Sequence, residues 1–253
     1  MSSAVGDRII EHLGTVARLR AARVADPALA ARVKAVKTYQ ARRFEATYAD
    51  LLASPRYRAA TRFFLEELYG PQEFADRDAQ FSRIVPSLVR LFPGELVGTV
   101  EMLGQLHALS EALDDGTARH LPAGPPGAPP EIPPDAPAYA RAWQANGRAP
   151  AREQQIALTL AIGAAMNRYT HNRLMRNTLR LMRGPARAAG LGDLQRFLEA
   201  GFDAFSAMNG ADDFLRSVGE RERALAAALF APSAVTIAAL PAAERTGPLA
   251  QLP

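Results

Sequence analysis

The sequence predicts an all-α fold. Helical periodicity of apolar residues dominates nearly the whole chain, and convincing strand-like alternation is almost absent. Asp, Ser, Pro and Gly stand where such helices would begin and end. We therefore expect a single compact multi-helix bundle of about nine or ten helices, with a proline-rich loop in the middle.

Capping residues and prolines set the expected helix boundaries. Asp26 and Pro27 suit the N-cap and first position of the second helix, and Ser54-Pro55 opens the third in the same way. Pro86 lies inside the fourth helix and predicts a kink. The predicted helices span residues 4–24, 27–53, 55–69, 71–92, 94–115, 137–145, 150–171, 172–183, 193–209 and 211–230.

A proline-rich segment interrupts this pattern. Eight prolines fall between Pro122 and Pro137, a density that neither a helix nor an inner strand tolerates. Residues 116–137 are therefore expected to form a loop. Because the helix around 156–166 is apolar on nearly all sides, it needs partners from both halves. We expect one domain over 1–231 and a flexible Ala/Pro-rich tail over 232–253.

Composition excludes several classes of protein. The chain has no cysteine, which rules out disulfides, thiolate catalysis and Cys-ligated metals. The net charge of +4 comes almost entirely from arginines spread along the chain, which makes nucleic acid an unlikely partner. No secretory signal or bilayer-length apolar run is present, so a cytoplasmic protein is expected. No nucleophile motif or cofactor fingerprint occurs, and no cofactor is predicted.

The stretch FFLEELYGPQEFADRD, residues 63–78, predicts a tight helical corner. Gly70 suits a left-handed C-cap, and Pro71 can open a new helix. On that helix Asp78 falls inside the apolar stripe, with Arg77 at its edge. A carboxylate there is costly unless it is paired. Asp78 is therefore interpreted as a structural ion pair or, less favoured, as a residue that lines a pocket.

The same stretch carries a family resemblance. Its pattern FF-x-x-x-LYG-P-x-x-F-x-x-RD resembles an uncharacterised family of bacterial all-helical proteins of about this size. The stretches at 47–60, 180–191 and 194–210 resemble the same family, so the likeness covers most of the chain outside the N-terminus, the proline-rich segment and the tail. The resemblance implies no established activity and no catalytic residues.

His107 and Glu111 form the first candidate site. They lie four residues apart on the core-facing side of the helix at 94–115, together with Asp114. A His/Glu pair with this spacing can bind a metal from one helix face, with His171 or Asp78 as a further ligand. The paired Glu-x-x-His repeats of di-metal bundles are missing, however. The favoured interpretation is a core histidine whose hydrogen bonds are made within the protein.

Two arginine-containing clusters are the other candidates. One groups Trp143, Arg148, Arg152 and Gln155 around the start of the helix at 150; it either organises that start or closes a polar pocket against Asp78. The other is a basic stripe on an amphipathic helix that could contact phosphates or a membrane surface. The favoured interpretation is a solvent-exposed face whose arginines pair with neighbouring carboxylates, rather than a contact with phosphates or with a membrane. The stripe comprises Arg173, Arg176, Arg180, Arg183 and Arg187.

These observations rank three functions. The leading hypothesis is a non-enzymatic helical protein that binds a protein partner or a small ligand, with a homodimer as one form of the partnership. The second is a helix-bundle metalloprotein or enzyme that uses His107 and Glu111. The third is an adaptor for anionic surfaces through the helix at Arg173–Arg187.

Overall fold

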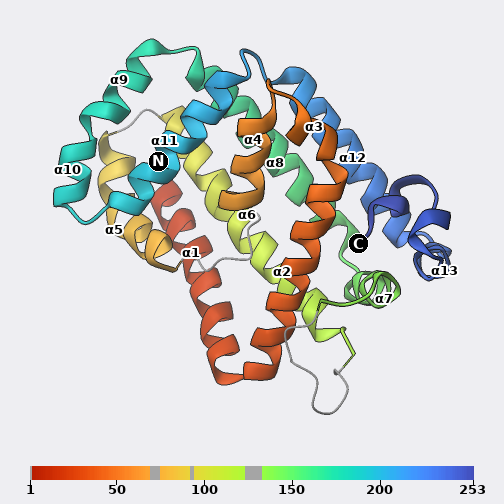
Figure 1. Ribbon diagram of the computed structural model, residues 1–253. Coiled ribbons are helices and arrows are strands. Elements are labelled where there is room, and N and C mark those ends of the chain that lie inside the picture. The colour runs from red at the N-terminus through yellow and green to blue at the C-terminus, as the bar shows by residue number, and fades with distance from the viewer. Residues whose placement is uncertain (1, 69–74, 92–93, 123–132) are drawn as a thin grey trace.

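The computed structural model describes residues 2–68, 75–91, 94–122 and 133–253. Every regular element within these ranges is helical, which confirms the all-α prediction. Helix α6 (Gly94–Arg119) runs through the middle of the molecule (Figure 1). Around it pack α1 (Ser2–Ala25), α2 (Pro27–Thr47), α7 (Ala136–Asn146) and α8 (Ala149–Thr170).

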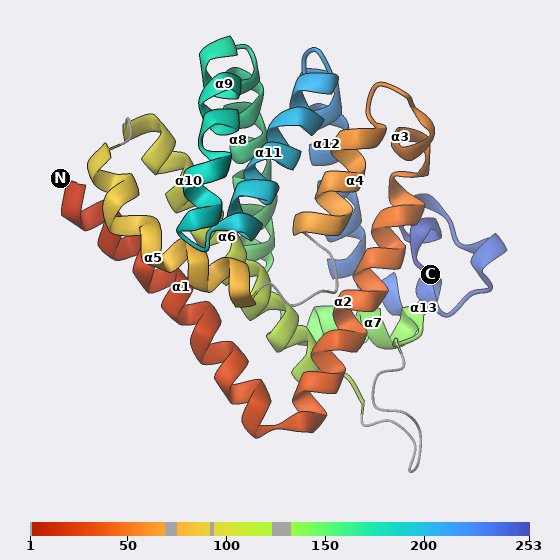
Figure 2. The same ribbon diagram turned by 60° about the vertical axis from the view of Figure 1, so that its left-hand side comes forward.

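Helices α1 and α2 form a long hairpin along one side of the molecule (Figure 2). Asp26 caps α2 as the sequence predicts: its side chain accepts a hydrogen bond of 3.0 Å from the Leu29 amide, and Pro27 occupies the first turn. The predicted helix 27–53 is divided at Tyr48, whose backbone (φ −114°, ψ 22°) leaves the helical region. A short helix, α3 (Ala49–Ala53), follows.

The middle helix α6 is longer than the sequence indicates. It continues to Arg119, past the expected start of the loop at residue 116. The Thr117 hydroxyl donates to the Leu113 carbonyl (2.9 Å), and Arg119 pairs with Asp115 at 2.7 Å. Both contacts lie within the last turn of the helix, where Thr117 also meets Asn146 and Arg152 from other helices. Most of the proline-rich segment lies outside the described residues.

The motif at 63–78 is described only in part. Helix α4 (Arg58–Phe63) continues into a π-helical turn, Phe64–Leu68, and α5 (Ala75–Leu91) follows after the corner. Phe63 is buried and its ring centroid lies 5.5 Å from that of Phe197. The corner itself and the side chains of Arg77 and Asp78 lie outside the described residues, so the interpretations of Asp78 stay predictions.

The second half of the chain supplies the remaining walls. The predicted helix 172–183 is divided at Met182 into α9 (Arg173–Leu181) and α10 (Arg183–Ala188), which form an outer arm (Figure 1). Helix α11 (Gly192–Ala207) contacts α4, α5 and α8, and α12 (Asp212–Phe230) lies along α8.

Glycines allow two of these helices to approach closely. A Cβ at Gly201 on α11 would lie 2.9 Å from Phe63 Cζ, and one at Gly219 on α12 would lie 2.9 Å from Leu160 Cδ1. Gly163 on α8 faces Leu215 in the same way. All three positions are therefore close helix crossings at which a side chain would collide.

The C-terminal residues differ from the expected flexible tail over 232–253. They form α13 (Ala234–Ala238) and two 3₁₀ helices, Ala242–Glu244 and Gly247–Gln251. Small and branched apolar side chains with helical spacing let this segment pack against α7 and α12. The buried members are Ala234, Ala238, Leu249 and Leu252.

Candidate functional site

A partly open pocket of about 60 Å³ lies between α2, the α4–π turn, α7, α8 and α12. We call it the Arg152 pocket. Aromatic side chains form much of its wall: Phe44, Tyr48, Phe64, Trp143 and Phe214. Its polar lining includes Gln40, Arg43, Arg152, Gln155 and Glu222. Apolar walls with a few buried polar groups are typical of small-molecule sites.

A sharp corner between α7 and α8 positions one end of the pocket. Gly147 (φ 63°) ends α7, and Arg148 (φ 61°) precedes α8 in the left-handed conformation. Trp143 stands one turn before this corner and Arg152 one turn after it. The reversal therefore brings the indole and the guanidinium together, with the Arg152 Cζ atom 3.8 Å from the Trp143 ring centroid.

Arg152 is a buried cation whose partners are neutral. It is 4% exposed. Its Nη1 donates to Gln155 Oε1 (3.2 Å) and its Nη2 to Thr117 Oγ1 (3.1 Å). In the described part of the chain no carboxylate lies within ion-pair distance of it. Burial lowers the pKa of Arg152, and the nearby Tyr139 and Asp114 only partly oppose that effect.

The opposite end of the pocket holds a paired arginine. Arg43 Nη1 lies 2.5 Å from Glu222 Oε1, which also accepts a 2.6 Å hydrogen bond from the Tyr48 hydroxyl. The Arg43 Cζ atom lies 3.7 Å from the Phe44 ring centroid. Burial favours a lower pKa for Arg43, but Glu222 outweighs it and the pKa is raised. The two arginines therefore differ in whether a carboxylate balances them.

Three buried donors in this pocket have no hydrogen-bond partner among the described residues. They are the Nε atoms of Arg43 and Arg152 and the Nε1 atom of Trp143. Buried polar atoms are nearly always hydrogen-bonded, since an unpaired donor loses its hydration without compensation. All three donors belong to residues that line the one pocket.

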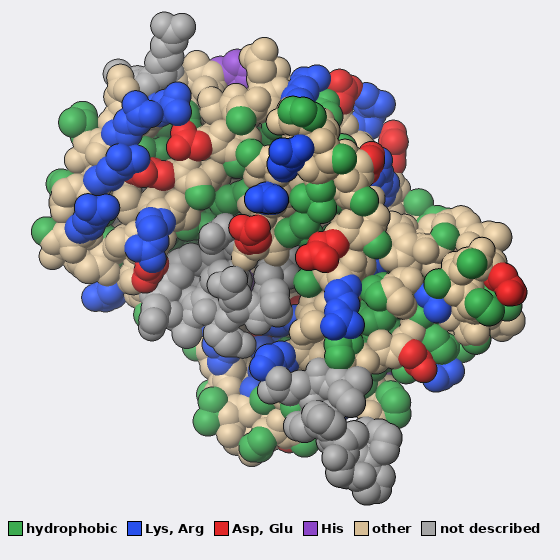
Figure 3. All heavy atoms as spheres, in the orientation of Figure 1, with side chains coloured by type: hydrophobic (Ala, Val, Ile, Leu, Met, Phe, Trp, Pro, Cys, Tyr) green, Lys and Arg blue, Asp and Glu red, His purple; other side chains and the backbone are tan. Residues whose placement is uncertain are grey.

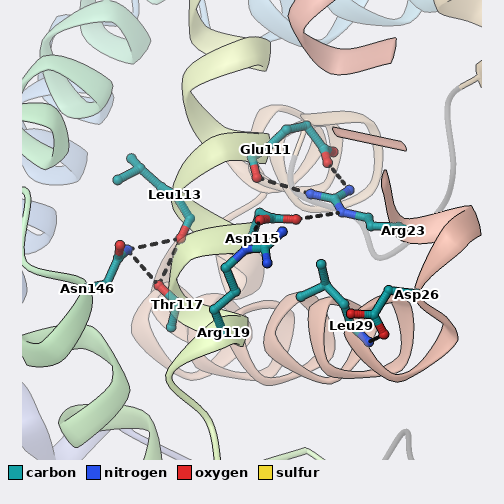
Figure 4. A network of polar contacts seen from close by, with 9 residues as sticks. All are labelled: Arg23, Asp26, Leu29, Glu111, Leu113, Asp115, Thr117, Arg119 and Asn146. Atoms are coloured by element: carbon teal, nitrogen blue, oxygen red, sulfur yellow. Dashed lines mark hydrogen bonds and ion pairs between the residues drawn. The ribbon is translucent and has the colours of Figure 1, made fainter. Parts of the chain in front are cut away.

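A second polar network lies behind the pocket, between α1, α2 and α6 (Figure 4). Glu111 accepts from Arg23 Nη1 (2.5 Å) and Lys37 Nζ (2.6 Å), and Asp115 pairs with Arg23 at 3.3 Å. Burial favours a raised pKa for Glu111, but the two cations outweigh it and hold the pKa at about 2. This network is a buried salt bridge that joins three helices.

Thr117 lies on the same helix, α6, and contacts the pocket residue Arg152. Its hydroxyl donates to the Leu113 carbonyl and accepts from Asn146 Nδ2 (3.2 Å) and Arg152 Nη2. Figure 4 shows Asn146 pointing at both Thr117 and the Leu113 carbonyl. Since a hydroxyl has one donor and two acceptor positions, Thr117 is fully used. It holds Arg152 in place from behind.

The residues predicted for a metal site have different surroundings. Glu111 is already bound by Arg23 and Lys37, whereas His107 is half-buried on α6. His171 is exposed at the end of α8, where its Nδ1 lies 2.7 Å from the Asn167 carbonyl oxygen. Within the described ranges no group of three His, Cys, Asp or Glu side chains could hold a metal ion.

The arginine stripe lies on the outer arm and is partly neutralised. Figure 3 shows a line of basic side chains there with acidic ones beside it. Arg176 pairs with Asp203 at 3.0 Å and Arg183 with Glu199 at 2.7 Å, so α11 supplies the carboxylates. Arg180 and Arg187 are exposed. The side chain of Arg173 is outside the described set.

The cluster that the sequence analysis grouped at this corner lies partly in the pocket lining. Trp143, Arg152 and Gln155 line the pocket, whereas Arg148 is exposed and is not among the lining residues. Arg43 and Glu222 were not predicted. A signal for Arg43 exists, because it lies seven residues after the buried Val36, on the same face of α2. Glu222 is distant in sequence and carries no comparable signal.

Comparisons with known proteins place the chain in a family. In the described residues no helix combines the length and apolar character needed to cross a membrane. Neither the curated proteins nor the solved structures give a match. One family model, described as a domain of unknown function (DUF8198), matches residues 19–235. That match spans all the elements that line the Arg152 pocket, and the chain belongs to the DUF8198 family.

Proposed function

We propose that this chain is a non-enzymatic, cytoplasmic binding protein whose ligand is a small organic molecule held in the Arg152 pocket. The observation that carries the proposal is the set of three buried donors, the Nε atoms of Arg43 and Arg152 and the indole Nε1 of Trp143, that line one pocket without protein acceptors. A ligand with acceptor atoms there removes the desolvation penalty of all three donors.

The walls of the pocket support a ligand with an apolar body. Phe44, Phe64 and Phe214 present rings to the same space, and the Phe64 and Phe214 centroids are 5.7 Å apart. The π-helical turn that begins at Phe64 places both Phe64 and Leu65 in the wall. Such turns occur often at functional sites because they re-aim side chains within a helix.

Intrinsic fluorescence provides a direct test. Trp143 is the only tryptophan in the chain and it lines the pocket, so its emission reports occupancy. Titration with hexanamide and with hexanoate, which share a six-carbon apolar body, is expected to change the emission saturably with at least one of them. Native mass spectrometry of the gently purified protein checks the stoichiometry, which we expect to be one ligand per chain.

A pocket-filling variant provides the control. Ala226 lines the pocket on α12 whereas the adjacent Ala227 is exposed. We expect Ala226→Leu to abolish the fluorescence response and Ala227→Leu to preserve it, because only the first adds volume inside the pocket. An identical response in both variants, or no response in the wild type, would contradict the proposal.

An anionic surface is a second candidate partner, favoured by one observation on the outer arm. Leu181 is 78% exposed and Met182 is 44% exposed, beside the basic side chains of Arg180 and Arg183. Apolar and basic residues together suit the interface of an anionic membrane. Sedimentation with vesicles rich in phosphatidylserine tests it. Binding that is lost when Arg176 and Arg180 are changed to Glu supports it, and no binding by the wild type removes it.

A further inference from the structure

We infer that the ligand of the Arg152 pocket is a monocarboxylate with a small apolar body. The inference rests on the proposed function, since it assigns the chemical class of the molecule in that same pocket. It follows from three properties of the pocket: its charge, the free edge of the Arg152 guanidinium, and its size.

The charge of the pocket lining favours a monoanion. Among the described residues that line it, Arg43 and Arg152 are cationic and Glu222 is the one carboxylate. Glu222 is bound by Arg43, so the unbalanced charge belongs to Arg152. A buried charge without a counter-charge is costly in a low-dielectric interior. One negative charge on the ligand removes that cost, whereas a neutral acceptor does not.

Asp114 is the nearest further carboxylate, and it does not take this role. It lies behind the pocket wall and accepts a 3.0 Å hydrogen bond from Gln40 Nε2. It acts on Arg152 only through space. Gln40 contacts Asp114, and Thr117 contacts Arg152. Its own burial disfavours the ionised form. Among the described residues, Arg152 is therefore left without an ion-pair partner, and its Nε atom without an acceptor.

The geometry of Arg152 suits two oxygens in one plane. A guanidinium has five N–H donors, and Arg152 uses two of them, toward Thr117 and Gln155. The Trp143 ring covers one face of that guanidinium, with the Arg152 Cζ atom 3.8 Å from the ring centroid. Nε and a terminal nitrogen can then donate side by side to the two oxygens of a carboxylate. The Trp143 Nε1 and Arg43 Nε donors lie in the same lining.

The size of the pocket limits the ligand to a small head group, and its charge argues against a phosphate. About 60 Å³ is less than half of the roughly 150 Å³ cavity that holds a benzene molecule, so the enclosed part fits a small head group. A phosphate monoester carries about −1.5 to −2 charges at neutral pH and three acceptor oxygens. One unbalanced arginine matches a carboxylate better in both charge and number of oxygens.

Three ligands with the same chain length test the inference: hexanoate, hexanamide and hexyl phosphate. Each is titrated into the wild-type protein at constant ionic strength, with Trp143 emission and calorimetry as readouts. We expect hexanoate to bind at least about tenfold more tightly than either of the others, as charge-assisted hydrogen bonds to a buried guanidinium require. No variant is needed for this comparison, so it does not depend on a mutant that folds.

Variants locate the effect at Arg152. Arg152→Met is expected to weaken hexanoate binding by about 10- to 100-fold and to change hexanamide binding by less than about threefold. Arg152→Lys keeps the charge but removes the planar edge, and should fall between wild type and Arg152→Met. Arg148→Met, at the exposed arginine of the same corner, should bind hexanoate as the wild type does.

Each remaining outcome has a definite meaning. Equal affinity for hexanamide and hexanoate overturns the carboxylate inference but leaves the proposed function standing. Tighter binding of hexyl phosphate reassigns the ligand to the phosphate class. If no compound binds and Ala226→Leu behaves like the wild type in every assay, the pocket holds water only, and both the inference and the proposed function fail.

Discussion

The Arg152 guanidinium lies over the Trp143 ring at 3.8 Å, with no carboxylate of the described residues paired to it. Arg43, in the same pocket, lies over Phe44 at 3.7 Å but is paired with Glu222. The two sites share burial and an aromatic platform and differ only in the counter-charge. On the proposed function, that difference separates a structural arginine from one that binds the ligand, and its effect can be measured as stability.

Replacing Arg152 is therefore expected to change stability little. Arg152→Met removes a desolvated charge together with two hydrogen bonds to neutral groups, so the free energy of unfolding should change by less than about 1 kcal/mol. Arg43→Met leaves the Glu222 carboxylate without its cation and should destabilise by about 3 kcal/mol. Urea unfolding of the two variants beside the wild type decides between them. A loss for Arg152→Met as large as that for Arg43→Met would make Arg152 structural.

Glu111 is expected to be a major stabilising residue. Glu111→Gln leaves Arg23 and Lys37 buried without their shared carboxylate, so we expect a loss of about 3–5 kcal/mol in the free energy of unfolding. Glu153→Gln is the matched control, because Glu153 pairs with Arg223 on the surface, where such pairs contribute less than about 1 kcal/mol. Denaturant titrations of both variants measure the contrast. Similar losses would show that burial of the Glu111 network has no energetic consequence.

The pH dependence of stability should carry the signature of Glu111. Its folded pKa of about 2 lies below the ordinary value of 4.5. The stabilisation it provides is therefore fully present above about pH 4.5 and is lost as the pH falls toward about 2. The wild type should lose roughly 3 kcal/mol relative to Glu111→Gln over that window. Unfolding measured at a series of pH values tests this, and parallel curves would refute it.

Asp114 should show the opposite sign. Burial raises its pKa, so its ionised form destabilises the fold, and that penalty disappears as the pH falls through the folded pKa. The stability of the wild type relative to Asp114→Asn should therefore increase on acidification. The same pH series measures it. A relative stability that decreases on acidification would mean that the cations near Asp114 outweigh its burial.

Two glycine substitutions should have opposite effects. Gly201→Ala places a Cβ 2.9 Å from Phe63 Cζ in a buried crossing of α4 and α11, and should destabilise by about 1–3 kcal/mol. Gly98→Ala, on α6, meets nothing within 4 Å and should stabilise by about 0.5–1 kcal/mol through helix propensity. Thermal unfolding of both variants gives the signs. Stabilisation by Gly201→Ala would mean that the Phe63 ring moves aside freely.

Local chemistry explains which elements the sequence predicted well. Asp26 and Pro27 begin α2, and Gly147 ends α7, because capping depends on a few adjacent residues. The errors occur where tertiary contacts decide. Tyr48 divides a predicted helix where its hydroxyl reaches Glu222 on α12, and α6 gains a turn where Thr117 meets Arg152 and Asn146. No local pattern encodes those partners.

The residues of the candidate site fall into the same two groups, those placed by local geometry and those placed by tertiary contacts. Trp143, Arg152 and Gln155 lie within thirteen residues around one helical corner, so their proximity follows from local geometry and was predictable. Arg43 and Glu222 are 179 residues apart along the chain, and only the tertiary arrangement of α2 and α12 around the pocket brings them together. Asp78, the residue that the wheel of α5 marks as unusual, stays a prediction because its side chain lies outside the described residues.

The sequence by itself determined that this protein is helical, where most helices start, and that Trp143, Arg152 and Gln155 lie near one helical corner. Periodicity and capping are short-range properties, and a single helix or corner is enough to express them. Only the tertiary structure decided which buried charges are balanced. That depends on whether a carboxylate from a distant segment reaches each arginine: Glu222 reaches Arg43, and no described carboxylate reaches Arg152.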